Sequence, residues 1–404
     1  MHAADVLGAR PRWVERLTVA LMSSAPLEQA RRMRPVGTLR RWRDRALLRG
    51  CASLSARLLA PALACSMLAC TAVRPTQSGS LGVIHNDTIW HDTDGNEIWS
   101  NGGDILREGD TFYWLGYETR PDHPWRMNLY ASSDLANWRF LNDVAAMKGE
   151  FRKLGWAGRP ALLHNPRTGK YVIVFEADGP EWTRHKVGFA VSDTIDGNYT
   201  LVRTEYPEPG RSTGDQSVYR EGADAYLVTV LDAPGFGGPN NYDLAIYKLT
   251  PDFLAIDRKV FEGFAGPRGR SGDAEAPSVI KRGATYYLFV SGLRGWHSTA
   301  TQYATAPALE GPWSAWRILY TLPESCDSFN TQHDLVMPIV GREGTVWLYV
   351  GDRYTQWHTI GIGRNVFLPL VWQDNIPTLK WLRDWRVDVS AGRFSPVHKA
   401  REQR

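Results

Sequence analysis

Residues 275–292 read EAPSVIKRGATYYLFVSG, in which an apolar strand, a turn containing Gly and an aromatic second strand follow one another. The same pattern recurs in GGDILREGDTFYWLGYE (102–118), GRPALLHNPRTGKYVIVFEA (158–177), GDQSVYREGADAYLVTVL (214–231) and TQHDLVMPIVGREGTVWLYVGD (331–352). With their heads placed at residues 102, 158, 215, 275 and 332, the copies repeat every 56 to 60 residues. A fixed interval of this size indicates a repeat architecture.

Each copy continues into a third short segment with strand character, such as LYASSDLANW (129–138). Three or four short strands separated by Gly, Asp or Asn turns predict one antiparallel sheet per copy. We therefore predict an all-β fold, a five-bladed β-propeller over residues 84–385, followed by a C-terminal tail at 386–404. Because the innermost strands of a propeller surround one axis, we expect the five strand heads to converge on one pocket.

The N-terminal segment differs from the rest of the chain in charge. Residues 1–77 carry a net charge of +9, whereas the remainder carries −5, so the body gives no reason to expect nucleic acid as a partner. The basic stretch 40–57 precedes the apolar run LLAPALACSMLA (58–69) and Cys70, an order typical of a secretory signal. This run is too short to span a bilayer comfortably.

The sequence MLAC (67–70) resembles a bacterial lipobox, which predicts cleavage before Cys70 and lipidation of that cysteine. Secretion without lipidation and an apolar segment without a signal function are the alternatives. We expect residues 1–77 to lie outside the fold, with 1–32 as an upstream extension. The protein is expected to be exported as a periplasmic or cell-surface lipoprotein or as a secreted protein, to be monomeric, and to meet a membrane only through this anchor.

Two carboxylates stand at the heads of neighbouring copies, Asp215 and Glu275. A carboxylate at the start of an apolar strand needs a partner or a function, since burial of an unpaired charge is costly. Two acidic groups that meet in a pocket match the needs of glycoside hydrolysis, in which a protonated carboxyl donates to the leaving oxygen. Burial and a neighbouring negative charge would raise the pKa of that acid. The alternative is that both residues are structural.

From His91 to Trp381 the chain resembles glycoside hydrolase family 43, most closely its exo-β-1,3-galactanase branch. The resemblance rests on a series of segments in the same order, which include HDTDGNEI (91–98), SSDLANW (132–138), EAPSVIKRGATYYLFVSGLRGW (275–296), YATAPALEGPW (303–313) and YVGDR (349–353). It implies that Glu275 is the general acid and that Asp215 tunes its pKa and orients the substrate. The usual base position falls on Gly102. In the branch a Gln positions or activates the water instead, either as an imidic acid tautomer or by orientation alone, and Gln332 matches it. A purely structural amide is the alternative.

Three positions depart from the branch. Its AHGGG segment has His and Gly where this chain has Asn101 and Asp104, and its Glu before the Arg-Pro of the second blade is replaced by Gly158. Residues 102 and 104 share one strand face, so Asp104 could act as a displaced base or bond to amides at the blade entrance.

Further candidates would bind the sugar. Trp296 could stack on a sugar face or pack in the core, and Trp182 is a second aromatic candidate. Strand alternation turns His333 away from the pocket and Asp334 toward it. The remaining candidate contacts to substrate hydroxyls are Glu118, Asn240, Asn241 and Asn101.

The resemblance implies an exo-acting, inverting glycosidase whose substrate is β-1,3-galactan or a related plant oligo- or polysaccharide side chain. The alternatives are an arabinofuranosidase or xylosidase with Asp104 as base, and a propeller that binds glycan without cleaving it. No cofactor is required, the sequence shows no metal-ligand motif, and related propellers leave room for a structural calcium ion on the axis.

Overall fold

The computed structural model describes residues 81–119, 126–145, 149–179, 185–232, 242–266, 274–354 and 364–397. These residues form strands and, between β5 and β6, the short 3-10 helix η1 (Gly149–Lys153). Within them no helix is long and apolar enough to cross a membrane. Cys70, Trp182, Asn240 and Asn241 lie outside the described residues.

The strands of the described residues form six sheets, four of which contain only consecutive strands. The first has β2 (Asn101–Glu108), β3 (Thr111–Tyr117), β4 (Met127–Ser132) and β5 (Arg139–Asp143). The second has β6 (Trp156–His164), β7 (Tyr171–Asp178), β8 (Lys186–Ser192) and β9 (Thr200–Glu205). The third has β10 (Ser212–Glu221), β11 (Asp224–Asp232), β12 (Tyr242–Leu249) and β13 (Ile256–Gly266). The fourth has β14 (Glu275–Arg282), β15 (Thr285–Ser291), β16 (Gln302–Ala306) and β17 (Arg317–Ile318).

The other two sheets join strands that are distant in sequence. The fifth has β19 (Gln332–Val340), β20 (Thr345–Asp352), β21 (Asn365–Gln373) and β22 (Ile376–Lys380), and β18 (Tyr320–Leu322) pairs with β22 in parallel. The sixth has β1 (Ile84–His85), β23 (Asp384–Asp388) and β24 (Arg393–Pro396).

The prediction of five blades is therefore wrong, because the propeller has six sheets. The sixth sheet carries no copy of the sequence repeat, since its strands come from opposite ends of the described chain and are only two to five residues long. Residue 84 pairs with residue 385, and β24 extends the sheet to Pro396, beyond the end of the predicted domain at residue 385.

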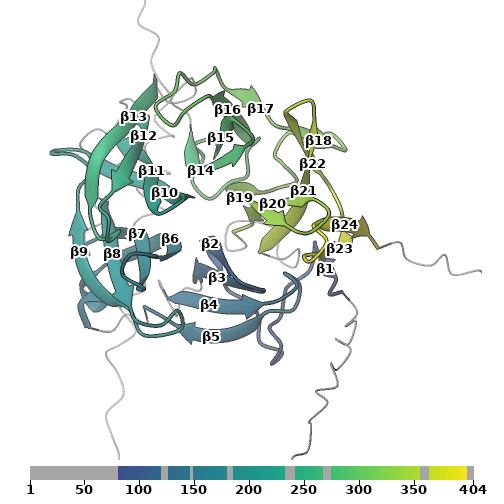
Figure 1. The fold of residues 1–404 in the computed structure, drawn as a ribbon, viewed down its shortest axis with the longest axis horizontal. Coiled ribbons are helices and arrows are strands. Elements are labelled where there is room, and N and C mark those ends of the chain that lie inside the picture. Colours follow the sequence, from purple (N-terminus) through teal and green to yellow (C-terminus); the bar gives the residue numbers. More distant parts are fainter. Residues whose placement is uncertain are drawn as a thin grey trace, which may run out of the picture. The chain divides into compact units, whose positions relative to one another are not determined.

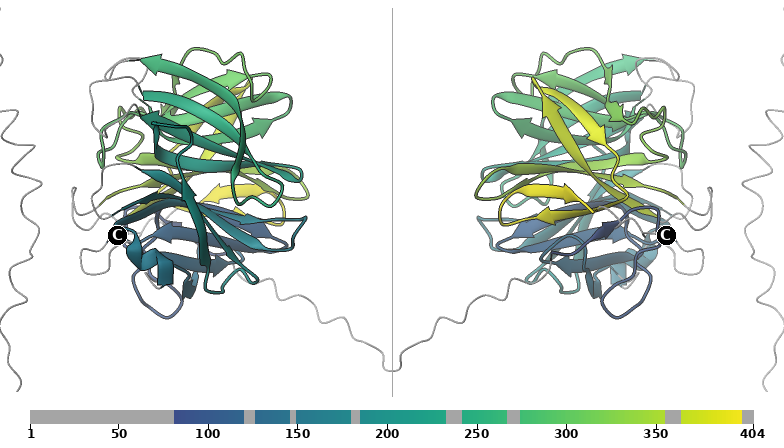
Figure 2. Two further views of the ribbon diagram at one scale, coloured as in Figure 1. Left: turned by 90° about the vertical axis from the view of Figure 1, so that its left-hand side faces the viewer. Right: turned by 90° about the vertical axis from the view of Figure 1, so that its right-hand side faces the viewer.

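The sheets are arranged radially, with β2, β6, β10, β14 and β19 nearest the centre (Figure 1). These strands contact one another in turn, and β19 closes the ring against β2. Seen from the side, the sheets overlap one another and most strands run across the view (Figure 2). The heads of the five inner strands consequently face the same small volume.

Each inner strand is bulged at its head. The strand register shifts between Asn101 and Asp104, Gly158 and Ala161, Thr213 and Gln216, Glu275 and Ser278, and His333 and Leu335. A bulge bends the strand and changes the direction of the side chains in it, which is why bulges are common beside active sites. Asp215 lies inside its bulge, whereas Glu275 begins one.

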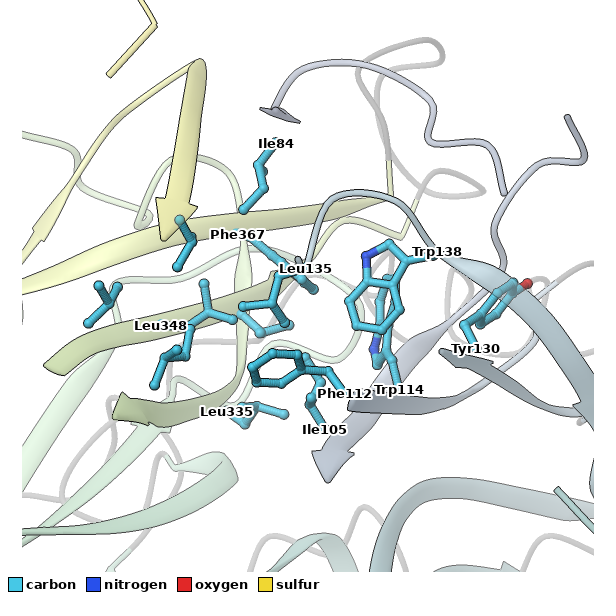
Figure 3. Close-up of a cluster of buried hydrophobic side chains, with 14 of the residues drawn as sticks. Ile84, Ile105, Phe112, Trp114, Tyr130, Leu135, Trp138, Leu335, Leu348 and Phe367 are labelled. Carbon is cyan, nitrogen blue, oxygen red and sulfur yellow. The ribbon is translucent and has the colours of Figure 1, made fainter. Parts of the chain in front are cut away.

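An aromatic cluster joins the first, fifth and sixth sheets (Figure 3). The ring of Phe367 lies 5.3 Å from that of Trp114, and the indole nitrogen of Trp385 donates to the Phe367 carbonyl at 3.0 Å. The Asn86 amide donates to the same carbonyl at 2.8 Å and accepts from the Phe367 amide at 3.1 Å. The sixth sheet is thus fastened where the first and last inner strands meet.

Candidate active site

Arg159 occupies the centre of the ring. It is the second residue of the β6 bulge and has a φ of +47°, a rare conformation for a residue with a side chain. Its side chain is only 5% exposed. Nε and Nη2 donate to the two carboxylate oxygens of Asp215, each at 3.1 Å, which is the bidentate geometry typical of a strong Arg–carboxylate pair.

The same guanidinium also contacts two residues of β19. Nη1 donates to Oδ1 of Asp334 at 3.1 Å, and Nη2 donates to Oε1 of Gln332 at 3.0 Å. The second oxygen of Asp334 accepts from the Gly103 amide of β2 at 3.0 Å. Strands from three sheets therefore meet at one buried cation, and Asp334 links a fourth sheet to it through Gly103.

Glu275 lies beside this cluster. Its Oε1 accepts from the Gln332 amide nitrogen at 2.7 Å and from the backbone amide of Arg294 at 3.3 Å. Burial, and then the negative charge of Asp215, raise the pKa of Glu275 well above its ordinary value. Since Oε1 is an acceptor in both contacts, the proton of the neutral acid belongs on Oε2.

Gln332 is held in one orientation. Its amide nitrogen donates to Glu275 and to the Gly295 carbonyl, at 2.7 and 3.1 Å, while its oxygen accepts from Arg159. Both amide hydrogens are thus in use, which is the pattern of a neutral amide rather than of an imidic acid. One lone pair of Oε1 is still able to accept a hydrogen bond from water.

Asp215 accepts a third hydrogen bond, from the Ala276 amide at 3.0 Å. Burial raises its pKa above the ordinary value, and Arg159 opposes this shift. Asp215, Glu275 and Gln332, whose strand heads the repeat predicts to converge, lie close together in the structure. His333 points away, with Nε2 2.8 Å from the Ser278 hydroxyl, and Asp334 faces the axis, as strand alternation predicts.

A tyrosine ring fills the space beside Gly102. A Cβ added to Gly102 would lie 2.4 Å from a ring carbon of Tyr117, and the residue has a φ of +53°. The Gly102 amide donates to Asp352, whose carboxylate also accepts from Asn365 at 2.9 Å and Asn101 at 3.2 Å. Burial raises the pKa of Asp352 to about 6.

Two sequence candidates, Asn101 and Asp104, have other surroundings. The Asn101 side chain is buried between Asp352 and Thr119, to which it is hydrogen-bonded. The Asp104 carboxylate lies 3.2 Å from Arg220 and 3.2 Å from the Leu162 amide. Among the described residues, no hydrogen bond or ion pair joins Asp104 to Glu275 or Gln332. It lines an axial cavity of about 400 Å³ instead.

Aromatic side chains gather near the acid. Trp296 is partly buried, with its ring 4.6 Å from Tyr354 and 6.0 Å from Trp156. It belongs to the loop after β15, which also supplies the Arg294 amide and the Gly295 carbonyl to the site. Glu118 is buried and accepts from the Asn128 amide at 3.3 Å.

Sequence reasoning missed the roles of Arg159, Tyr117 and Asp352. Arg159 was visible only as part of an Arg-Pro pair, and nothing in the repeat indicates that a bulge turns it to the axis. Within the described ranges, no three His, Cys, Asp or Glu side chains are grouped as metal ligands. The arrangement offers one neutral acid, one oriented amide and one cation that balances the nearby carboxylates.

The chain is similar to one family model and to several solved structures. The model of glycosyl hydrolases family 43 matches residues 101–377. An exo-β-1,3-galactanase from Clostridium thermocellum is 28% identical, with 79% of this chain and 70% of that chain covered and a TM-score of 0.70. An exo-β-1,3-galactanase variant from Phanerochaete chrysosporium, solved with β-1,3-galactotriose, is 26% identical, with 78% and 71% covered and a TM-score of 0.68. Among curated protein sequences no relative matches.

Replacement of Arg159 by Met should destabilise the fold by about 3–5 kcal/mol near neutral pH, because it leaves buried carboxylates without a countercharge. Folding raises the pKa values of both Asp215 and Asp334, so the folded state binds more protons and these groups lower stability as pH rises above about 4. Without Arg159 the loss of stability with rising pH should be larger, so Arg159→Met should lower the free energy of unfolding more at pH 8 than at pH 5. Urea unfolding of both proteins at the two pH values measures this difference.

The matched control is Arg258→Met, since the Arg258 side chain is 60% exposed and its salt bridge is to the adjacent Asp257. Its cost should stay within about 0.5 kcal/mol. Equal costs for Arg159→Met at the two pH values would contradict the charge-balancing role.

Gly102→Ala should cost more than backbone strain alone, because the added methyl group meets the buried Tyr117 ring. Gly109 provides the control, since its φ is +60° but nothing lies within 4 Å of an added Cβ. We expect a loss of about 1 kcal/mol for Gly109→Ala and at least about 2 kcal/mol for Gly102→Ala, from urea unfolding. Similar losses for the two variants would mean that Tyr117 does not block this position.

Proposed function

This chain belongs to glycosyl hydrolase family 43, and on that premise we propose that it releases galactose from the ends of β-1,3-galactan with inversion, using Glu275 as the general acid. The coarser statement that it is a glycosidase follows from the family. The galactan substrate is supported by the two galactanases to which the chain is similar over most of its length.

The observation that carries the proposal is the contact between Glu275 and Gln332. It engages Oε1 of the acid and leaves the proton on Oε2, while burial and Asp215 keep the carboxyl protonated at higher pH than usual. A protonated carboxyl can donate to the glycosidic oxygen as the bond to the anomeric carbon breaks. Asp215 supports this state, since Arg159 favours its negative charge.

Gln332 would orient the attacking water. Its oxygen already accepts from Arg159, which makes the amide less basic, so we assign it orientation rather than proton removal. The transition state of glycoside hydrolysis resembles an oxocarbenium ion. A water molecule that bonds to such a carbon becomes a strong acid and can release its proton to bulk water after attack. A carboxylate base is therefore dispensable.

Asp104 is less suited to act as the base of an arabinofuranosidase or xylosidase, since its carboxylate is paired with Arg220. We also propose export of the protein through its N-terminal segment, with lipidation at Cys70. This rests on the basic stretch, the apolar run and the MLAC sequence alone.

Purified protein incubated with oligosaccharides of β-1,3-galactan, arabinan and xylan should release galactose from galactan alone, with the α-anomer appearing first by NMR. Release of arabinose or xylose would identify another substrate class. Binding without product would indicate a glycan-binding propeller.

Glu275→Gln should lower turnover of galactan about 10²–10⁴-fold, because the amide cannot supply the proton. An aryl β-galactoside with a good leaving group needs little protonation, so the same variant should lose much less activity on it. In the wild type, activity should fall as pH rises through the raised pKa of Glu275, and this limb should be absent in the variant. Equal losses on both substrates would argue against the acid role.

A further inference from the structure

A buried ion pair lies beside the site but is not used by the mechanism above. Nδ1 of His185 lies 2.5 Å from Oε1 of Glu176, and its Nε2 lies 3.6 Å from Oδ2 of Asp178. The side chains of Glu176 and His185 are only 4% and 7% exposed. Buried charges of this kind are costly, so their retention requires a reason.

The pair is connected to both bulges that carry the central charges. Glu176 on β7 is the cross-strand partner of Gly158, which begins the bulge containing Arg159. The backbone carbonyl of His185 accepts from the Thr213 amide at 3.0 Å, and Thr213 begins the bulge containing Asp215. The Glu176–His185 ion pair thus joins the two backbone segments that pair with the bulges of Arg159 and Asp215.

Trp156 completes this support. A Cβ on Gly158 would lie 2.4 Å from the Trp156 indole, so that ring occupies the space beside Gly158. The indole also lies beside Glu176 and helps to stabilise its carboxylate. No side chain larger than glycine fits at residue 158 without displacing this ring.

The pair also acts on the site through its charges. The pKa of Glu176 is lowered through His185, and the pKa of His185 is raised chiefly through Glu176, with Asp178 and Asp215 adding to it, so each partner favours the charged form of the other. Among the residues that the structure describes, the charged groups that act on the pair are Asp178 from β7, Asp215 from β10 and Arg159 from β6.

We propose that the Glu176–His185 ion pair is a positioning element of the active site, which holds the Arg159 and Asp215 bulges in register and balances the charge beside Asp215. This inference rests on the proposed function only for its kinetic test. Both residues act through Arg159 and Asp215 and need no contact with substrate.

Charge balance predicts opposite effects for two single variants. Glu176→Gln removes a negative charge near Asp215 and should move the alkaline limb of kcat to lower pH, whereas His185→Gln leaves Glu176 and Asp178 unbalanced and should move it to higher pH. Each shift should be about one pH unit at low salt. The double variant should return the limb close to that of the wild type, and KM should change little.

The pH profiles are measured on galacto-oligosaccharide with the full chain, after thermal unfolding has shown that each variant is folded. Glu176→Asp, which keeps the charge, should retain the wild-type limb. If the wild type turns over substrate and the alkaline limb of kcat lies at the same pH in all variants, the inference is overturned while the proposed function stands. No turnover by the wild type would overturn the proposed function, and the inference is then decided by a second measurement.

That measurement is the NMR titration of His185 in the full chain. Since Asp215 adds to its raised pKa, Asp215→Asn should lower the pKa of His185. Glu176→Gln should lower it further, because Glu176 is the larger contributor. A His185 titration that is unaffected by Asp215→Asn would show that the pair does not sense the site, and would overturn the inference.

Discussion

The centre of this propeller depends on the neutralisation of buried carboxylates by one guanidinium. Arg159 contacts Asp215 of β10 and both Asp334 and Gln332 of β19. Without a fixed cation, like charges at this spacing would push the strand heads apart. The planar guanidinium also orients what it binds, so charge balance and geometry come from the same side chain.

The state of the acid follows from this arrangement. Arg159 favours ionised Asp215, and burial followed by the negative charge of Asp215 raises the pKa of Glu275. Gln332 connects Arg159 to Glu275, since its oxygen accepts from the guanidinium and its nitrogen donates to the acid. A carboxylate at the position of Gln332 would bring another negative charge against Glu275, whereas a neutral amide does not.

The sequence repeat was sufficient to locate Asp215, Glu275 and Gln332 near one axis, because a fixed interval places equivalent strand heads together. It was insufficient for Arg159, since a positive φ inside a bulge reverses the side chain and leaves no periodic signal. Tyr117 reads as one more aromatic strand residue, and its occupation of the space beside Gly102 depends on the packing of β3 against β2. The sixth sheet was missed because β1 and β23 contain no repeat and become neighbours only when the ring closes.

That closure has a consequence for how the protein is made. The sheet that fastens the ring needs β1 from the start of the described chain and β23 and β24 from its end, so an emerging chain cannot complete it until nearly all of it has been synthesised. Until then the first blade, with its cluster of large aromatic side chains, is left without its final partners. Nascent chains of this propeller therefore expose apolar side chains and unpaired strand edges until β23 and β24 have been made, and such surfaces favour aggregation. The yield of folded protein should consequently depend on chaperones, even if the completed propeller is stable.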